Sequence, residues 1–586
     1  MRQWMVAAKK ADFYAIAEKF HVDPVVARII RNREVIGEKN IRIYLGGNLS
    51  DLSDPHQMKD MDRLVEILAQ KIRKQVRIRI IGDYDVDGVT SSHLFLTALR
   101  RVGAKVDVVI PHRIQDGYGL SLHLLQQAKE DGVDTILTCD NGIAAIDEIA
   151  WAKAQKMTVL VTDHHAVPFE EHEGRRTEKK SLADAVVNPH QQDCGYPYKE
   201  LCGAGVAWNV IRVLYENYDM DKREAEDLLD FVAMATVCDV MSLTGENRIL
   251  VKEGLKRIRH TKNIGLQALM QACNVQPENI SAYHFGYVLG PCVNATGRLD
   301  TARHALRLFE TGQETEAEEI ARDLVDLNQE RKELTLQGVE MAKKLCEEGG
   351  YENDPILVLF LPDVHESIAG LIAGRIREMY NRPVFVLTRG EEGVKGSGRS
   401  TENYSMYENM CGCAELFTKF GGHPMAAGLS LPEENVEKFR RKINENCPLT
   451  VEEVCPDIHI DMAMPVGYAS TELVHQFALL EPFGKDNPSP LFADRNLSIS
   501  RMWVIGKNRN VLRMSVLSEY GQPVPVIFFG DVETLFAYFT EKFGQEEVEN
   551  ALHGRKNRIL FSMVYTAKVD FYQGNENLQL EMKYYR

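Results

Sequence analysis

Three aspartates, Asp83, Asp85 and Asp87, occupy every second position directly after the β-rich run 76–81. Charged carboxylates this close repel one another, so the spacing indicates a site that binds cations. An EF-hand calcium loop also opens with Asp-x-Asp-x-Asp-Gly, but it requires a Glu at position twelve and flanking helices. Position twelve is Leu94 here, and the leading segment is strand-like. The motif is therefore either a solvated acidic turn or a site for other divalent metal ions.

Two more apolar runs end in polar residues in the same way. Residues 135–139 lead into Asp140, and residues 158–162 lead into Asp163 and His164. In open α/β sheets the carboxyl ends of parallel strands meet at one crevice, where such proteins place their sites. The sequence therefore predicts that the polar residues after the three runs lie together: Asp83, Asp85, Asp87, Asp140 and His164.

A fourth apolar stretch, 231–238, ends in Asp239 and is either a buried helix or a buried strand. Taken alone, Asp239 could equally be a helix cap or a turn residue. Carboxylate and imidazole ligands without a cysteine pattern suit Mn²⁺ or Mg²⁺ better than structural zinc. A pair of these ions is the usual apparatus of phosphoester hydrolysis, so the cluster predicts a phosphoesterase.

The chain resembles the DHH phosphoesterase family at four motifs, in the family's order: 83–88, 140–142, 163–165 and Asp239. Further segments resemble the RecJ family of bacterial single-strand exonucleases: 111–113, 117–119, 294–299, 396–400 and 421–428. The resemblance covers nearly the whole chain. It implies a metal-dependent exonuclease that removes mononucleotides from the 5′ end of single-stranded DNA in DNA repair and recombination.

The resemblance also implies a site for two Mn²⁺ or Mg²⁺ ions that share one carboxylate. The first ion would be held by Asp85, Asp140 and either Asp83 or water. The second ion would be held by Asp87, Asp140, His164 and Asp239. Asp140 would then bridge the two ions.

Two neighbours of the ligands and one departure complete this interpretation. His165 would contact the scissile phosphate or a metal, with a satisfied structural histidine as the alternative, and Asp163 would orient nearby groups. Many members of the family carry a histidine at the position of Ile81, which cannot bind a metal. The first ion would then depend on Asp83 or water.

A pocket for the 5′ phosphate is also implied, because guanidinium and hydroxyl groups donate hydrogen bonds to phosphate oxygens. Its residues would be Arg113, Arg298, Ser397 and Arg399, with His423 facing a phosphate from a closing loop. The alternatives are arginines in solvated loops and a tight turn capped by His423. Cys292 replaces an arginine that is common in the family, which could remove one phosphate contact.

Positioning these residues requires an α/β chain with several domains. Strand-like and helix-like segments alternate from residue 76 onward, which indicates a parallel sheet, and residues 314–348 have the spacing of one long helix. We predict a helical extension over 1–70, a parallel-sheet DHH catalytic domain over 71–280, a linker with a long connecting helix over 281–350, a second α/β, DHHA1-like domain over 351–455 and a β-barrel over 456–586.

The resemblance implies that the barrel is an oligonucleotide-binding (OB) fold, where Trp503 could stack bases. Without the resemblance, Trp503 would be interpreted as a core residue.

The charge and composition of the whole chain also limit the possible functions. The net charge of 69 − 85 = −16 argues against a general polyanion binder, so any DNA groove must be local. The sequence has no stretch long enough to span a bilayer and no adequate signal-peptide core. Eleven cysteines without a Cys-x-x-Cys pair fit reduced thiols and a cytoplasmic protein.

Two alternative functions remain open. A DHH phosphodiesterase of short oligoribonucleotides or cyclic dinucleotides would share every metal ligand, but it would need neither the N-terminal extension nor the barrel. A non-catalytic replication scaffold should have lost ligands, whereas all are present here. For the exonuclease we expect single-stranded DNA, a single-strand binding protein and a helicase as partners, and no membrane.

Overall fold

The computed structural model describes residues 3–112, 119–172, 175–299, 301–390, 393–506, 509–572 and 574–586. The chain forms two compact units. The first unit comprises Leu52–Met241 and Ile249–Pro456, and the second comprises Gln3–Asp51, Ser242–Arg248 and Asp457–Arg586. Within the described residues, no helix has the length and apolar character needed to cross a membrane.

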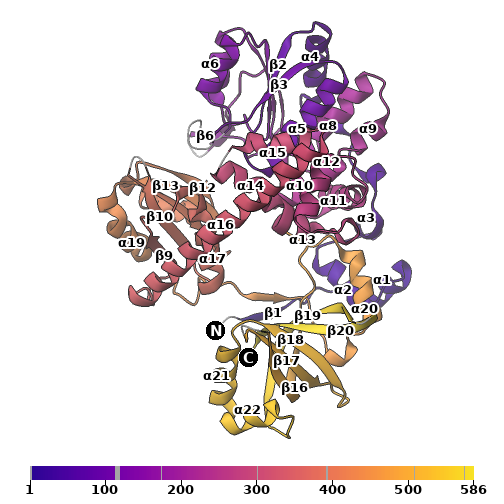
Figure 1. The fold of residues 1–586 in the computed structure, drawn as a ribbon, viewed down its shortest axis with the longest axis vertical. Helices are drawn as coiled ribbons and strands as arrows, with labels where there is room; N and C mark the ends of the chain where they lie inside the picture. The colour runs from indigo at the N-terminus through magenta and orange to yellow at the C-terminus, as the bar shows by residue number, and fades with distance from the viewer. Residues whose placement is uncertain are drawn as a thin grey trace. The chain divides into compact units, whose positions relative to one another are not determined.

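The first unit contains a five-stranded parallel sheet in the order β3-β2-β4-β5-β8. Figure 1 labels β2 and β3 of this sheet. Its strands are β2 (Arg77–Ile81), β3 (Lys105–Val109), β4 (Thr135–Cys139), β5 (Thr158–Thr162) and β8 (Ala185–Val187). The three apolar runs predicted as strands are β2, β4 and β5, and every residue of β4 is buried. All neighbouring strands are parallel, which confirms the prediction of a shared carboxyl edge.

Helices pack around this sheet. They are α4 (Met61–Arg73), α5 (Val86–Arg101), α6 (Leu122–Glu130), α7 (Ile146–Ala154), α8 (Gly203–Asn217), α9 (Lys222–Glu226) and α10 (Leu229–Cys238). A small antiparallel pair, β6 (Phe169–His172) and β7 (Arg175–Glu178), precedes β8. The stretch 231–238 is helical because α10 packs against both α5 and α8, and Asp239 is its C-cap.

A run of helices connects the two sheets of the first unit. They are α11 (Gly245–Ile258), α12 (Ile264–Ala272), α13 (Ala282–His284), the π-helical turn η4 (Phe285–Leu289), α14 (Gly290–Leu299), α15 (Ala302–Glu310) and α16 (Glu314–Glu348). The long helix expected over 314–348 is confirmed as α16. Its buried residues Ala317, Ile320 and Leu324 follow helical spacing, and the helix packs against α12 and α14.

The second sheet of this unit has the order β12-β13-β11-β10-β9, with only β9 and β10 parallel. Its elements are β9 (Leu357–Phe360), α17 (Glu366–Tyr380), β10 (Val384–Gly390), β11 (Gly393–Arg399), α18 (Met406–Cys411), β12 (Lys419–His423), β13 (Ala426–Leu431) and α19 (Val436–Glu445). Side chains alternate along β10, so Val384 and Val386 join the core under α17 whereas Phe385 and Leu387 join the core on the other face. Helix α17 packs on β10 and β11.

The second unit is built on a barrel, as the sequence predicted. Its strands are β15 (Met462–Ala463), β16 (Phe492–Ile505), β17 (Val511–Leu517), β18 (Pro523–Phe529), β19 (Leu560–Tyr572) and β20 (Asn575–Tyr585). The order is β15-β16-β17-β18-β20-β19, and β16 also pairs with β19. This extra pairing closes the ring of β16, β17, β18, β20 and β19. Helices α20 (Thr471–Gln476), α21 (Val532–Phe543) and α22 (Gln545–Leu552) accompany the strands.

The helices expected near the N-terminus form, but they belong to two different units. Those of the second unit are α1 (Phe13–Phe20), α2 (Pro24–Asn32) and α3 (Glu38–Gly46), whereas α4 belongs to the first. Strand β1 (Trp4–Val6) pairs with β14 (Ile458–Ile460), and the buried Arg248 donates hydrogen bonds to Tyr44 O and Leu480 O, both at 2.8 Å. Our domain boundaries stay predictions.

Candidate functional site

The first aspartate motif lies in the turn between β2 and α5. Asp85 is the N-cap of α5, and its Oδ1 accepts a hydrogen bond from Gly88 N at 3.0 Å. A Cβ atom at Gly88 would lie 2.5 Å from backbone atoms of Asp83, so the tight turn requires glycine at this position. The local sequence thus brings Asp83 and Asp85 to the carboxyl end of β2.

The third carboxylate of the motif, Asp87, is held by the N-terminus of α8. Its two oxygens accept hydrogen bonds from Gly203 N at 2.6 Å and from Ala204 N at 2.7 Å. The free N–H groups and the dipole of a helix N-terminus both favour a negative charge there. Asp87 is buried, so water has little access to its carboxylate. The N-terminus of α8 therefore sets the orientation of this group.

Asp140 follows β4 in the left-handed backbone region, with φ at 61°. Aspartate tolerates this conformation better than most other residues with a side chain. The next residue, Asn141, donates from Nδ2 to Ile81 O at 3.1 Å and to Cys139 O at 2.9 Å. Asn141 therefore ties together the ends of β2 and β4, from which Asp83 and Asp140 extend.

The segment Asp163–His165 follows β5. Asp163 Oδ1 accepts hydrogen bonds from His164 N at 2.7 Å and His165 N at 3.1 Å, and it lies 2.8 Å from His165 Nδ1. Its Oδ2 accepts a hydrogen bond from Ile143 N at 2.9 Å. Protein donors thus occupy both oxygens of Asp163, which suits a carboxylate that orients its neighbours.

His164 lies where these loops and α10 meet. Its Nε2 is 3.1 Å from Asp140 Oδ1, 3.7 Å from Asp87 Oδ2 and 3.6 Å from Asp239 Oδ2. Ligand atoms lie within 4.8 Å of one another in three overlapping groups: Asp83, Asp85 and Asp140; Asp87, His164 and Asp239; and Asp140, His164 and His165. The structure therefore brings together every residue that the sequence analysis assigned to metal binding, and Asp140 belongs to two of the groups.

Burial and mutual repulsion raise the pKa of several carboxyl groups in this cluster. Burial, and then the charge of Asp85, raise the pKa of Asp83 to about 8. Burial, and then the charge of Asp87, raise the pKa of Asp85 above its ordinary value. Burial, and then the charges of Asp87, Asp85 and Asp239, raise the pKa of Asp140 well above its ordinary value. A bound cation would reverse these shifts, because it favours the charged form of each carboxyl group.

The two histidines have opposite pKa shifts. Burial lowers the pKa of His164, which leaves its imidazole neutral and able to bind a metal. Burial also acts to lower the pKa of His165, but its hydrogen bond to Asp163 and nearby carboxylates outweigh burial and raise it to about 9. His165 is therefore a cation at neutral pH. Although burial acts to raise the pKa of Asp163, the hydrogen bond from His165 and the histidine charges hold it below the ordinary value.

The residues of the cluster fit divalent cations. Asp83 Oδ1 and His164 Nε2 are buried and have no hydrogen-bond partner among the described residues. Carboxylate oxygens with an imidazole nitrogen form a donor set that Mn²⁺ and Mg²⁺ accept. Ile81 adds no ligand, because its aliphatic side chain has no donor atom, and it is buried in the core beside the sheet.

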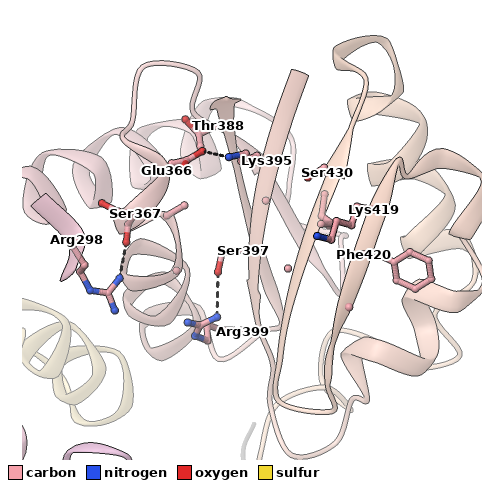
Figure 2. Close-up of a pocket in the computed structure, with 16 residues that line it drawn as sticks. Arg298, Glu366, Ser367, Thr388, Lys395, Ser397, Arg399, Lys419, Phe420 and Ser430 are labelled. Atoms are coloured by element: carbon pink, nitrogen blue, oxygen red, sulfur yellow. Dashed lines mark hydrogen bonds and ion pairs between the residues drawn. The ribbon is translucent and has the colours of Figure 1, made fainter. Parts of the chain in front are cut away.

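A pocket of about 510 Å³ lies in the domain built on β9–β13 (Figure 2). Arg298 enters it from the end of α14 and donates from Nη1 to Ser367 O at 2.6 Å. Arg399 donates from Nη1 to Ser397 Oγ at 3.2 Å and to Gly398 O at 2.7 Å. Backbone and hydroxyl oxygens thus orient two guanidinium groups around a concave surface. Three of the four predicted phosphate residues, Arg298, Ser397 and Arg399, line this pocket together.

Helix α17 leaves space for these groups. A Cβ atom at Gly370 would lie 2.8 Å from both Arg399 Nη2 and Ser397 Oγ, so a larger residue would displace them. Two lysines that the sequence analysis missed, Lys395 and Lys419, also line the pocket, and Lys395 pairs with Glu366 at 2.8 Å. Alternation along β11 was the available signal, because Lys395, Ser397 and Arg399 occupy every second position of one strand.

The remaining predicted residues are not among those that line the pocket or form the carboxylate cluster in the described part of the chain. Arg113 lies outside the described residues. His423 is exposed at the end of β12 and does not line the pocket. Trp503 belongs to the second unit, where it is 37% exposed and lies under the Arg501 guanidinium at 5.8 Å. Cys292 is buried, and its Sγ faces Cys273 Sγ at 3.7 Å instead of the pocket.

Comparison with known proteins identifies the family. Family models match residues 77–236 (DHH family, N-terminal domain), 353–447 (DHHA1 domain) and 460–584 (RecJ OB domain). The curated single-stranded-DNA-specific exonuclease RecJ of Haemophilus influenzae is 32% identical over 581 residues, which is 96% of this chain and 96% of that protein. The chain belongs to the RecJ family.

Two further RecJ proteins agree with this assignment. RecJ of Bacillus subtilis is 33% identical over 512 residues, which is 87% of this chain but only 63% of that protein, so the chain spans less than two thirds of this relative. The crystal structure of RecJ in complex with Mn²⁺ from Thermus thermophilus matches with a TM-score of 0.79 and 25% identity, covering 100% of this chain and 79% of that chain. The predicted RecJ resemblance and the α/β architecture with DHH, DHHA1 and OB domains are confirmed.

Proposed function

We propose that this RecJ-family protein is a metal-dependent exonuclease that removes 5′-mononucleotides from the 5′ end of single-stranded DNA, in DNA repair and recombination. One observation carries the proposal: α14 links the carboxylate cluster to the cationic pocket. Asn294 Oδ1 accepts a hydrogen bond from Val86 N at 3.1 Å beside the cluster, and Arg298 lines the pocket. Four helical residues rise about 6 Å, which is the scale of one nucleotide. A 5′ phosphate held in the pocket would therefore place the next phosphodiester near the cluster.

We assign the cluster to two divalent cations, Mn²⁺ or Mg²⁺. One ion would take Asp83, Asp85 and Asp140, and the other Asp87, Asp140, His164 and Asp239. Such a pair, when bound, polarises the phosphodiester and lowers the pKa of the attacking water. The protein holds the ligands for this chemistry: α8 orients Asp87, the left-handed turn orients Asp140, and burial keeps His164 neutral.

His165 would act on the scissile phosphate, and Asp163 would orient His165. Asp163 lies 2.8 Å from His165 Nδ1 and so orients the imidazole, whose Nε2 would donate a hydrogen bond to a phosphate oxygen. The positive charge of His165 would offset charge that develops on that phosphate.

The pocket would bind the terminal phosphate. Guanidinium groups match phosphate oxygens with paired hydrogen bonds, and Arg298, Arg399 and the Ser397 hydroxyl already share one surface. Lys395 and Lys419 would add positive charge at the rim. Arg113 and His423 stay predicted phosphate contacts.

The second unit and the partners extend this proposal. We assign the barrel to remote contacts with the strand, with Trp503 stacking on a base. We also propose a single-strand binding protein and a helicase as partners, since the enzyme needs unpaired strands. All eleven cysteines are free thiols, which supports a cytoplasmic location.

One assay tests the function and its alternatives. Purified protein with Mn²⁺ or Mg²⁺ is offered 5′-labelled and 3′-labelled single-stranded DNA, duplex DNA, a short oligoribonucleotide and a cyclic dinucleotide. We expect labelled mononucleotide at once from the 5′-labelled strand and only late from the 3′-labelled strand. Preferred turnover of the short RNA or cyclic substrate would favour a small-substrate phosphodiesterase, and no turnover of any substrate would favour a scaffold.

A further inference from the structure

Two exposed tyrosines form a stacked pair at the start of the helical segment that runs along the cluster. The rings of Tyr283 and Tyr287 lie 5.1 Å apart at an interplanar angle of 25°. Tyr283 is 63% exposed and Tyr287 is 71% exposed. Residues four apart on a helix are neighbours, so their spacing brings the two rings together. The function proposed above assigns these rings no role.

The tyrosines share one continuous helical segment with the residues that link the cluster and the pocket. Helical turns α13, η4 and α14 follow one another without a break from Ala282 to Leu299 (Figure 1). Asn294 and Arg298 are four residues apart on α14 and so lie on one side of it. Tyr287 precedes them by seven and eleven residues, within η4. The segment includes a π-helical turn, a feature that is often found at functional sites.

The same segment packs against the other side of the cluster. Cys238, the neighbour of Asp239, donates from Sγ to Phe285 O at 3.3 Å. A Cβ atom at Gly290 would lie 2.3 Å from Cys238 Sγ, so η4 and the start of α14 pack directly on the end of α10. Along the segment, the stretch 283–290 thus carries both the tyrosine pair and the contacts to the Asp239 side of the cluster, Asn294 contacts the Val86 side, and Arg298 lines the phosphate pocket.

We propose that Tyr283 and Tyr287 are a stacking platform for bases on the 3′ side of the scissile phosphate. The inference rests on the proposed exonuclease function, because the occupant of the platform is the substrate strand. With the 5′ phosphate at Arg298 and the scissile phosphate at the cluster, the strand continues toward the tyrosines. Eleven helical residues span about 16 Å, so the platform lies beyond the first nucleotide.

Base stacking suits a protein of this charge. The chain carries a net charge of −16, so much of the strand's affinity must come from contacts other than phosphate pairing. Stacking on aromatic rings is tolerant of sequence, because every base has a flat π face. Tyrosine keeps its hydroxyl in water while its ring remains available to a base.

The test combines tyrosine variants with abasic substrates. Steady-state kinetics compare wild type with Tyr283→Ala/Tyr287→Ala on 5′-phosphorylated strands that carry one abasic nucleotide at positions 2 to 6. We expect the double alanine variant to raise KM on the intact strand about five- to a hundredfold, with a much smaller change in kcat. In wild type, an abasic nucleotide at the platform position should raise KM, and in the double variant it should have little further effect.

Matched variants separate stacking from other causes. Tyr283→Phe/Tyr287→Phe keeps both rings and should recover most of the affinity that the alanine pair loses. Tyr14→Ala removes another exposed tyrosine, on α1, and should leave KM unchanged. Thermal melting checks that each variant folds.

The outcomes distinguish the platform from the function beneath it. If wild type fails to degrade single strands, the proposed function fails. If wild type degrades them and the alanine pair has the same KM, or stays equally sensitive to abasic positions, the platform is wrong and the exonuclease assignment stands.

Discussion

The carboxylate cluster and the phosphate pocket belong to one compact unit but have opposite character. The cluster is largely buried and rich in carboxyl groups, and burial raises the pKa of its members Asp83, Asp85 and Asp140. The pocket is open and lined with cationic side chains that backbone and hydroxyl oxygens orient. The cluster thus carries unfavourable charge that a cation would relieve, whereas the pocket is arranged for an anion. A phosphodiester strand with a bound metal pair requires both.

Because the cluster and the pocket differ in this way, mutations in them should affect different sets of substrates. Damage to the cluster should affect every substrate, because each cleavage event passes through it. Damage to the pocket should affect only strands whose 5′ end carries the group that the pocket binds.

Replacing the shared carboxylate should abolish activity. Asp140→Asn is the sharper variant, because asparagine tolerates the left-handed backbone at this position better than alanine does. Loss of one electrostatic stabiliser costs about 10²–10³ in kcat, and Asp140 would contact both ions, so we expect a loss of about a thousandfold or more. Turnover is measured at saturating Mn²⁺ with 5′-phosphate and 5′-hydroxyl strands.

A surface acid supplies the control for this variant. Asp147→Asn changes an exposed acid in the first turn of α7 and should keep wild-type turnover. Equal melting temperatures without metal would show that Asp140→Asn is folded. Substantial turnover by folded Asp140→Asn would remove Asp140 from the bridging role.

Removing one guanidinium group from the pocket should be selective. Arg399→Ala should lower kcat/KM on 5′-phosphorylated strands by about ten- to a hundredfold, because a charge-assisted hydrogen bond contributes about 1.5–3 kcal/mol. Strands with a 5′ hydroxyl should change much less. An equal loss on both ends would mean that Arg399 acts on the scissile phosphate or on folding.

The matched control is Arg389→Ala. Arg389 lies on β10 in the same domain, and it pairs with Glu433 at 3.0 Å on the surface. We expect its removal to leave the preference for a 5′ phosphate intact.

Metal binding should depend on pH, whereas the pocket's arginines stay charged. The metal-free pKa of Asp83 is about 8, so a cation must displace a proton below that pH. Apparent Mg²⁺ affinity should therefore fall as pH drops from about 8 to 6, by up to about tenfold per pH unit for each proton displaced. Calorimetry in buffers of different ionisation enthalpy counts these protons. A pH-independent affinity, or an unchanged slope in Asp83→Asn, would contradict this origin.

The same pKa shift has a consequence for stability. The folded, metal-free chain binds a proton at Asp83 more tightly than the unfolded chain, whose ordinary value is 3.8. Its contribution to stability is present below about pH 4 and is lost as pH rises toward about 8. Added Mg²⁺ should therefore raise the melting temperature more at pH 8 than at pH 6. A smaller rise at pH 8 would contradict the sign of the shift.

The smallest effect is expected in the second unit. Trp503→Ala should weaken binding of long single strands by about five- to tenfold and leave short strands nearly unaffected, because the barrel is assigned to remote contacts. Fluorescence anisotropy with strands of increasing length measures this. Equal losses on short and long strands would argue against a remote contact.

Much of the cluster could be predicted from the sequence because its information is local. Asp83, Asp140 and His164 each follow an apolar run, and parallel strands bring their carboxyl ends to one edge by backbone geometry alone. Ser397 and Arg399 came from the family resemblance, and the alternation along β11, which also places Lys395 on their face, was overlooked. These features depend only on the period of a strand and the direction of neighbouring strands.

Only the tertiary structure decided which distant surfaces pack together. Asp87 depends on Gly203 and Ala204 of α8, more than a hundred residues away, and Arg298 depends on the backbone of Ser367. The first helices pack with the barrel unit, and Cys292 faces Cys273, for the same reason. Spacing along the chain determines which residues share a strand end or a helix face. It does not determine which of many apolar faces meet, because that choice depends on the shape and burial of the whole core.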